Sequence, residues 1–294
     1  MKPACLFVVA TPIGNLEDLS DRARRTLKEV AFIYAEDTRH SRFLLTSIGT
    51  NATLRSLHEH NQRARQNEIR DLLAQGFSIA LITDAGTPAV SDPGAQVIHA
   101  MATAGFKISP IVGPSALAAA LSVCGFVANE KSSENVLFFG FLPRQSKDLE
   151  QVILQMKAHL GLVVFFESPQ RITEQLQRLA GIMPNRQACL CRELTKVYEE
   201  IRRGTIAELI AWAQEQPPRG EITVVLGAKD NSRPKNCIQN EDDLAFLNKA
   251  VNHCLNEGLS ARDVSIAFAS ILDKPRQAIY KLCLSVKNNN ESQR

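Results

Sequence analysis

The chain has 294 residues, of which 45% are hydrophobic and 22% charged, and its formal net charge is +3. This composition is that of a globular protein, and the mild positive charge permits a nucleic-acid partner without requiring one. No apolar run is long enough to cross a bilayer. The seven cysteines include no C-x-x-C motif. Their pattern argues against a disulfide framework and a zinc site, and it predicts a cytoplasmic protein.

Residues 1–125 alternate segments that predict strands with segments that predict helices. Strands are expected at 5–10, 31–37, 77–83 and 107–112, and helices at 19–30, 61–76, 95–105 and 113–126. Ser20 is the expected N-cap of the first helix, and Gly76 and Gly105 close the second and third. The strands are continuous apolar runs, which favours a largely parallel sheet covered on both faces.

A polar connector at 126–135 leads into a second α/β block that ends at residue 228. Ser168 is the expected N-cap of one of its helices, with Pro169 in the first helical position. The block is predicted to contain strands at 135–142, 161–168, 186–194 and 220–228 and helices at 144–159, 168–182 and 205–216.

The chain ends in a linker at 229–243 and a small helical domain at 244–294. Ser260 and Asp263 are the expected capping box of its middle helix. Three short helices with a tight turn resemble a helix-turn-helix, which would bind nucleic acid, or a bundle that packs on the main body. The helices are expected at 244–258, 264–272 and 274–284.

Four loops with small or polar residues follow the strands of the first block. Ligands of parallel sheets bind beyond the carboxyl ends of the strands, so loops that share this edge predict a pocket. No P-loop, G-x-G-x-x-G, G-x-S-x-G or metal-ligand cluster is present. What remains is a pocket of backbone groups and apolar walls, which suits a ligand of mixed polarity. The loops are 10–20, 35–41, 83–94 and 113–116.

Eight ordered motifs give the chain a resemblance to a known family: "VATPIGNLEDLS", "YAEDTRHS", "DAGTPAVSDPG", "GPSA", "FFGFLPR", "FFESPQR", "RELTKVYEE" and "GEITVVLGA". The chain resembles the tetrapyrrole methylase superfamily and, within it, the ribosomal RNA small subunit methyltransferase I family. The resemblance implies two α/β domains with S-adenosylmethionine between them. It also implies methylation of the ribose 2′-hydroxyl of a cytidine in the decoding region of 16S rRNA, by a homodimer and without a metal.

The resemblance also implies which residues hold the cofactor. Gly86 would allow close backbone approach, and Pro88 would stiffen the loop. Asp84 would contact the cofactor or the substrate ribose, or would serve only as an N-cap or in an Asx-turn. The implied cofactor residues are Pro12, Gly14, Asp84, Ala85, Gly86, Thr87, Pro88, Val90, Ser115, Ala116, Leu142 and Thr223.

A ribose hydroxyl is a poor nucleophile, so a base or an electrostatic helper is expected. The candidate catalytic residues are Glu36, Asp37, Glu167 and Lys196. Each could instead form a structural ion pair. The candidate RNA-binding residues are Arg22, Arg25, Arg39, Arg144, Arg171, Arg192 and Arg276. These could instead be solvated or paired with acids.

Two other functions remain open at this point. The first is a methylase of a tetrapyrrole or another small acceptor, with the same fold and cofactor. The second is a non-catalytic RNA-binding or ribosome assembly factor, which would bind the small subunit and transfer no methyl group.

Overall fold

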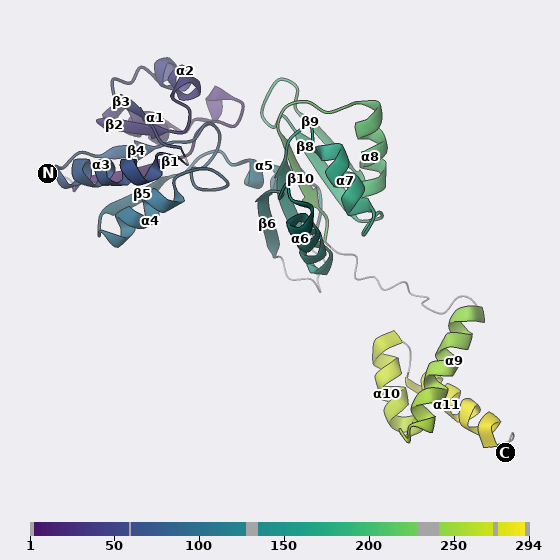
Figure 1. Cartoon of the computed structure of the whole chain (residues 1–294). Helices are drawn as coiled ribbons and strands as arrows, with labels where there is room; N and C mark the ends of the chain where they lie inside the picture. Colours follow the sequence, from purple (N-terminus) through teal and green to yellow (C-terminus); the bar gives the residue numbers. More distant parts are fainter. Residues whose placement is uncertain (1–2, 59, 128–134, 229–240, 273–275, 292–294) are drawn as a thin grey trace. The chain divides into compact units, whose positions relative to one another are not determined.

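The computed structural model describes residues 3–58, 60–127, 135–228, 241–272 and 276–291 (Figure 1). The chain divides into two compact units, Met1–Lys229 and Asp230–Arg294. Most of the expected linker at 229–243 and most of the connector at 126–135 lie outside the described residues. The boundary between two α/β domains at residue 125 stays a prediction, because both blocks belong to the first unit.

The first sheet is entirely parallel, as the sequence predicted. Its spatial order is β3-β2-β4-β1-β5. The carboxyl ends of all five strands therefore share one edge. The strands are β1 (Cys5–Val9), β2 (Phe32–Ala35), β3 (Thr53–Ser56), β4 (Ile79–Leu81) and β5 (Lys107–Ile111).

Four helices cover the two faces of this sheet. They are α1 (Asp21–Glu29), α2 (Thr38–Ile48), α3 (Gln62–Ala74) and α4 (Ala95–Thr103), and a 3-10 turn, η1 (Leu16–Asp18), precedes α1. One hydrophobic cluster joins α1 and α2 to Ile33, and another joins α3 and α4 to Tyr34. Ile33 and Tyr34 are neighbours in β2, so the two clusters occupy opposite faces.

The expected helix caps of this block are confirmed. The Ser20 side chain accepts a hydrogen bond from the Ala23 amide. Gly76 and Gly105 have φ of 93° and 79° just after α3 and α4. Two elements were not expected, namely α2 and β3. Asp37 caps α2 by accepting from the Arg39 amide, so the expected loop at 35–41 is shorter than the sequence suggested.

The second sheet has the order β6-β7-β10-β8-β9. Only β6 and β7 are parallel, and the other neighbours are antiparallel. β9 was not expected from the sequence. The strands are β6 (Val136–Phe141), β7 (Leu162–Glu167), β8 (Gln187–Arg192), β9 (Glu200–Thr205) and β10 (Ile222–Leu226).

Helices α6 (Ser146–Ala158), α7 (Ile172–Ala180) and α8 (Ile206–Glu215) pack on one face of the second sheet, against Val163 and Phe165. The other face, at Val164, packs on α5 (Ala116–Val123), which follows the last strand of the first sheet. Because α5 follows one sheet and packs on the other, it joins the two within a single unit.

The prediction that Ser168 is the N-cap of α7 is wrong. The helix begins at Ile172, and a turn over Ser168–Arg171 precedes it. The Ser168 carbonyl accepts hydrogen bonds from the amides of Arg171 and Ile172, while its own amide donates to Glu167 Oε1 at 2.7 Å. Ser168 is thus held by the preceding carboxylate, and Pro169 lies in the turn instead of the first helical position.

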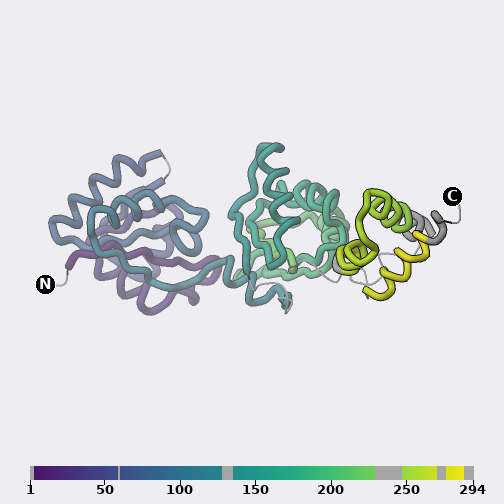
Figure 2. The backbone as a smooth tube through the Cα atoms, turned by 90° about the horizontal axis from the view of Figure 1, so that it is seen from below, coloured from purple at the N-terminus to yellow at the C-terminus, as the bar shows by residue number. Residues whose placement is uncertain are grey.

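The second unit contains α9 (Glu241–Asn256), α10 (Ala261–Leu272) and α11 (Arg276–Glu291), at the yellow end of the tube in Figure 2. The three helices pack around Val251, Val264 and Cys283. Ser260 Oγ accepts from the Asp263 amide, as in the expected capping box, but Asp263 Oδ2 accepts from the Ser260 hydroxyl instead of its backbone amide. No helix in the described part of the chain is long and apolar enough to span a membrane.

Candidate functional site: a cavity between the two sheets

The loop at 83–94 has an unusual backbone. Positive φ angles occur at Gly86 (85°) and Gly94 (121°) and also at Ala89 and Ser91, both at 67°. A side chain at positive φ is strained, and such strain persists only where the surroundings fix the conformation. The amides and carbonyls of Thr11 and Gly86 form two reciprocal hydrogen bonds, at 2.9 and 3.1 Å. The loops after β1 and β4 are therefore joined.

A cavity of about 390 Å³ lies beside this loop. The first sheet lines it through the loops after β1, β4 and β5, and the second sheet lines it through the ends of β6 and β7 and the start of β10. Three of the four predicted loops therefore meet at one cavity. Its lining residues are Ile13, Asp84, Ala85, Gly86, Thr87, Val90, Ser91, Asp92, Ser115, Ala116, Phe141, Phe166, Glu167, Ser168, Pro169, Gly220, Glu221, Ile222 and Thr223.

Eight of the twelve expected cofactor residues line this cavity, namely Asp84, Ala85, Gly86, Thr87, Val90, Ser115, Ala116 and Thr223. Pro12 lines a second cavity that adjoins it. Leu142 is buried behind the lining residue Phe141. Gly14 packs against Leu194 and Lys196, and Pro88 belongs to the loop without lining the cavity.

Several lining residues were not singled out from the sequence. Asp92 and Ser91 lie in the quoted "DAGTPAVSDPG" motif, but no role was given to them. Phe141 lies at the end of β6 in the quoted "FFGFLPR" motif, and its 59% exposure is a property of the fold that no local sequence pattern shows. Glu221 precedes β10, and no sequence signal distinguishes it either.

Carboxylates from both sheets line the cavity, namely Asp84, Asp92, Glu167 and Glu221, and Glu36 lies beside Asp92 in an adjoining cavity. Glu36 Oε2 accepts a hydrogen bond from Thr83 Oγ1 at 3.1 Å. Burial and then the charge of Glu36 raise the pKa of Asp92 to about 6, although a hydrogen bond from Thr83 opposes the rise. Asp84 Oδ1 accepts from the Asp37 amide at 3.1 Å, which ties the N-terminus of α2 to the loop after β4.

Asp37 is a helix cap with a paired charge. Its carboxylate accepts from the Arg39 amide at 2.8 Å and from the Arg39 side chain at 2.7 and 3.1 Å. These hydrogen bonds from Arg39 hold the pKa of Asp37 well below its usual range. A carboxylate with so low a pKa is a weak base.

Glu167 is fully buried at the end of β7. Its Oε2 lies 3.2 Å from Arg171 Nη2 in an ion pair, but no described group makes a hydrogen bond to it. Burial raises the pKa of Glu167, and the Ser168 amide and Arg171 counteract this. Arg171 Nη2 also donates to the carbonyls of Leu142 and Pro143, so this pair fixes the end of β6.

Lys196 is held between two carboxylates. Its Nζ lies 2.8 Å from Glu193 Oε1 and 3.2 Å from Glu221 Oε2. Although burial favours the neutral amine, these hydrogen bonds and charges raise the pKa of Lys196. The lysine is therefore protonated at neutral pH and cannot accept a proton there.

The expected RNA-binding arginines have different surroundings. Arg171 is paired with Glu167, and Arg192 is paired with Glu200 at 3.1 Å. Both contacts stabilise the second sheet. The exposed members of the set are Arg22 and Arg25 on α1, Arg39 on α2, Arg144 before α6 and Arg276 on α11.

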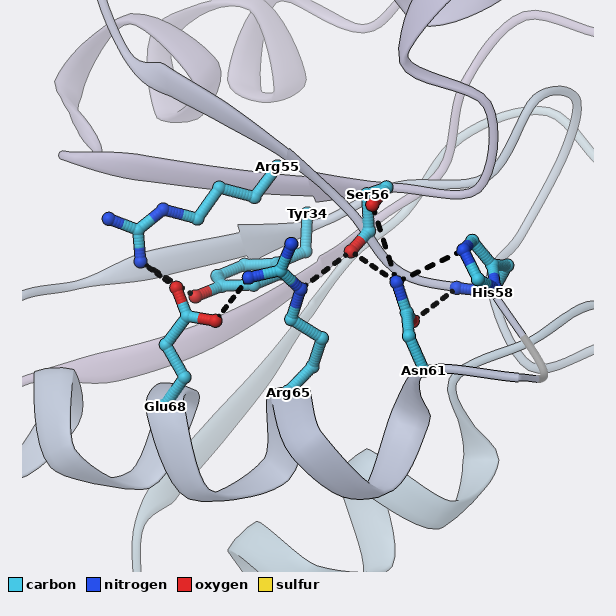
Figure 3. A network of polar contacts seen from close by, with 7 residues as sticks. All are labelled: Tyr34, Arg55, Ser56, His58, Asn61, Arg65 and Glu68. Carbon is cyan, nitrogen blue, oxygen red and sulfur yellow. Dashed lines mark hydrogen bonds and ion pairs between the residues drawn. The ribbon is translucent and has the colours of Figure 1, made fainter.

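A third cavity adjoins the first at Ser91 and Asp92, and it is also lined by Glu36, His58 and His60. A polar network holds His58 there (Figure 3). Its amide donates to Asn61 Oδ1 at 2.9 Å, and Asn61 Nδ2 donates to the Ser56 carbonyl. Ion pairs of Glu68 with Arg55 and Arg65 complete the network. No cluster in the described residues could hold a metal ion.

Comparison with known sequences identifies the family of this chain. The sequence model of the family "Tetrapyrrole (Corrin/Porphyrin) Methylases" matches residues 5–210. The Ribosomal RNA small subunit methyltransferase I of Halalkalibacterium halodurans is 42% identical over 75% of this chain and 75% of its own length. The protein of that name from Bacillus subtilis is 36% identical over 94% of this chain and 92% of its own length. The one from Escherichia coli O157:H7 is 34% identical over 95% of this chain and 94% of its own length.

Solved structures share the fold at low sequence identity. A cobalt precorrin-4 methyltransferase matches with a TM-score of 0.59 at 15% identity, over 76% of this chain and 94% of its own. A uroporphyrin-III C-methyltransferase from Thermus thermophilus, complexed with S-adenyl homocysteine, matches with a TM-score of 0.52 at 18% identity. The match covers 76% of this chain and 97% of that protein. The sequence relationships and the shared fold together show that the chain belongs to the ribosomal RNA small subunit methyltransferase I family of the tetrapyrrole methylases.

Proposed function

We propose that this chain is an S-adenosylmethionine-dependent methyltransferase of the small-subunit ribosomal RNA. We further propose that it methylates the ribose 2′-hydroxyl of a cytidine in the decoding region of 16S rRNA. The names of the relatives support the RNA substrate, and the S-adenyl homocysteine complex of a protein with this fold supports the cofactor.

The lining of the main cavity is the observation that carries the cofactor proposal. S-adenosylmethionine combines a purine, two ribose hydroxyls, a carboxylate and two cationic centres. Ile13, Val90, Phe141 and Ile222 offer apolar walls to the purine. The carboxylates of Asp84 and Asp92 offer negative charge to the cations, whereas Glu167 and Glu221 are already paired with Arg171 and Lys196. The volume of about 390 Å³ lies in the range of small-molecule sites.

Backbone groups of the cavity suit the polar parts of the cofactor. Gly86 has no side chain to hold a ligand away from the main chain. α5 starts at Ala116 with no side-chain cap from Ser115, so its first amides are available as donors to a carboxylate. When bound there, S-adenosylmethionine supplies a methyl group on a sulfonium.

The task of the remaining residues is to align and deprotonate the ribose hydroxyl. Of the four candidate catalytic residues, Lys196 is held protonated, Asp37 has a lowered pKa, and Glu167 is paired with Arg171. We therefore favour Glu36 as the proton acceptor. Glu36 Oε2 accepts a hydrogen bond from Thr83 Oγ1, and the charge of Glu36 helps to raise the pKa of Asp92, a residue that lines the main cavity.

Calorimetric titration with S-adenosylmethionine tests the cofactor site. Ser115→Trp places a large ring in the cavity and should abolish the heat of binding. Ser122→Trp is the matched control, because Ser122 is an exposed serine of the same helix outside the cavity. If both variants bind the cofactor as tightly as the wild type, the cavity is not the cofactor site.

Methyl transfer distinguishes the three functions. With methyl-labelled cofactor, the wild type should label 16S rRNA in small ribosomal subunits and leave a tetrapyrrole acceptor unlabelled. Labelling of the tetrapyrrole alone would favour a small-molecule methylase. Tight binding to the subunit without any labelling would favour an assembly factor.

We also propose a cytoplasmic homodimer. The described residues expose several large apolar side chains that a partner copy could cover, among them Val112, Val197 and Tyr198. Light scattering should give twice the chain mass of 32.4 kDa, and a value equal to one chain mass would refute the dimer.

A further inference from the structure

A second cavity, of about 330 Å³, adjoins the proposed cofactor cavity through Asp84, which lines both. Helix α2 forms one wall of the second cavity, and the loop after β1 forms the other. The proposed cofactor site leaves most of this space without a role. Its lining residues are Thr11, Pro12, Leu16, Arg39, His40, Ser41, Phe43, Leu44, Thr83 and Asp84.

The α2 wall presents an exposed aromatic ring beside exposed cations. Phe43 is 71% exposed. The Arg39 side chain is 90% exposed, and although its Nε and Nη2 donate to Asp37, its Nη1 donates to no described residue. Residues four apart lie on the same face of a helix, so the Arg39 and Phe43 side chains are neighbours. Arg42 is also exposed and forms no ion pair with any residue that the structure describes. α2 contains no acidic residue.

This wall is fixed to the cofactor loop. Leu45 and Ile48 pack against the first sheet, and Leu44, which lines the second cavity, belongs to the same hydrophobic cluster. At its N-terminus, the Asp37 amide donates to Asp84 Oδ1, and the Asp37 carboxylate caps the helix. The position of Phe43 relative to the cofactor loop is therefore set by packing and hydrogen bonds, which a precise acceptor site requires.

Exposed aromatic rings beside arginines are typical of sites for unstacked nucleotides. A base stacks on the ring, and the guanidinium groups hold the backbone phosphate. An enzyme that acts on one nucleotide of a folded RNA must take that nucleotide out of its stack. The sugar of a nucleotide on this wall would lie toward Asp84, the boundary with the cofactor cavity, and close to the Thr83–Glu36 hydrogen bond.

We propose that the second cavity, together with Arg39, Arg42 and Phe43 of α2, binds one extrahelical nucleotide of single-stranded RNA. Its base stacks on Phe43, its phosphate contacts the two arginines, and its ribose faces Asp84. The proposal rests on the proposed function, because it names the acceptor site of that same reaction. The third cavity suits a nucleotide less well, because the carboxylates of Glu36 and Asp92 repel phosphate.

The test measures RNA affinity and cofactor affinity in the same variants. The probe is a fluorescent RNA hairpin with the sequence of the 16S decoding region. Stacking of one base contributes about 1–3 kcal/mol, so Phe43→Ala should weaken RNA binding by about tenfold. Phe43→Trp keeps an aromatic ring and should bind RNA as tightly as the wild type. The calorimetric Kd for S-adenosylmethionine should stay unchanged in both variants.

Phe77→Ala is the control for loss of an exposed aromatic ring, because Phe77 is partly exposed and precedes β4 at the opposite edge of the sheet. Its RNA affinity should equal that of the wild type. Arg42→Ala should reduce the slope of log affinity against log salt by about 0.7, as expected for one phosphate contact to single-stranded RNA.

Two results would overturn the proposal. RNA affinity of Phe43→Ala within twofold of the wild type would show that no base stacks there. Dissociation of an oligomer in Phe43→Ala, with normal RNA affinity, would show that α2 contacts a second copy of the chain instead. Failure of the proposed function is a separate result, because it would appear in the methyl-transfer assay as a wild-type protein that labels no rRNA. That assay uses no Phe43 variant.

Discussion

Gly220 offers a sharp test of how the second sheet shapes the cavity. It lines the cavity at φ +81°, and a Cβ there would lie 2.2 Å from Glu193 Oε1 and 2.3 Å from Glu193 Cδ. Glu193 Oε1 accepts hydrogen bonds from Lys196 Nζ at 2.8 Å and from the Glu221 amide at 2.9 Å. Gly220→Ala must therefore displace the carboxylate that joins these two residues.

The expected loss of stability caused by Gly220→Ala has two parts. An alanine at positive φ costs about 1 kcal/mol. Displacing Glu193 weakens two charge-assisted hydrogen bonds, each of which contributes about 1.5–3 kcal/mol when buried. The Lys196 side chain is 28% exposed, so solvent screening brings this part below that range, to about 2 kcal/mol for the two bonds together. We expect Gly220→Ala to lower the free energy of unfolding by about 3 kcal/mol.

Gly105→Ala is the matched control, because Gly105 has φ +79° and nothing within 4 Å of its Cβ position. It should cost about 1 kcal/mol in urea unfolding followed by circular dichroism. In a Glu193→Ala background the clash is absent, so Gly220→Ala should cost only about 1 kcal/mol there. Equal costs for Gly220→Ala and Gly105→Ala in the wild-type background would refute the reasoning.

Three further predictions concern pH, packing and salt. The pKa of Asp92 is about 6 in the folded protein and 3.8 for an ordinary aspartate, so folding favours its protonated form. The contribution of Asp92 to the stability of the folded protein therefore falls as the pH rises from 3.8 to about 6. The difference in the free energy of unfolding between Asp92→Asn and the wild type should therefore be about 1 kcal/mol more favourable to the variant at pH 8 than at pH 4. This value is reduced for the partial exposure of Asp92. An equal difference at both pH values would contradict the prediction. Leu176→Ala removes a fully buried side chain of α7 and should cost about 3 kcal/mol in urea unfolding, whereas a loss below about 1 kcal/mol would place Leu176 outside the core. RNA affinity of the wild type should fall as salt rises, with a log–log slope of about −0.7 per phosphate contacted, and a flat response would speak against RNA as substrate.

Four of the five strands of the first sheet could be predicted because each is a continuous apolar run between turn residues. The fifth, β3, was missed because its sequence "TLRS" is mostly polar and only half-buried. α2 was missed because its first turn, "TRHS", is polar and belongs to a loop motif. Its signals were present in the N-cap Asp37 and in the apolar spacing of Leu44, Leu45 and Ile48. β9 was missed because its sequence "EIRRGT" has little hydrophobic alternation, and its pairing with β8 decides its conformation.

The first-sheet side of the cavity could be predicted from loops that follow parallel strands, because topology alone brings them to one edge. The second-sheet side could not, because Phe141, Phe166 and Glu221 come from strands whose arrangement no local pattern specifies. Gly140 illustrates the difference. It lies in β6 at φ +63°, which itself favours glycine, and a Cβ there would lie 2.4 Å from Ser91 Oγ of the 83–94 loop, a contact that no local sequence pattern specifies.

The most direct test of the proposed reaction is to incubate the protein with methyl-labelled S-adenosylmethionine and small ribosomal subunits that lack the modification, and then to map the label in 16S rRNA. The label should appear on the ribose 2′-oxygen of one decoding-region cytidine, and it should be absent with Ser115→Trp and present with Ser122→Trp. Label on a base, or none in the RNA despite calorimetric binding of the cofactor, would contradict the account.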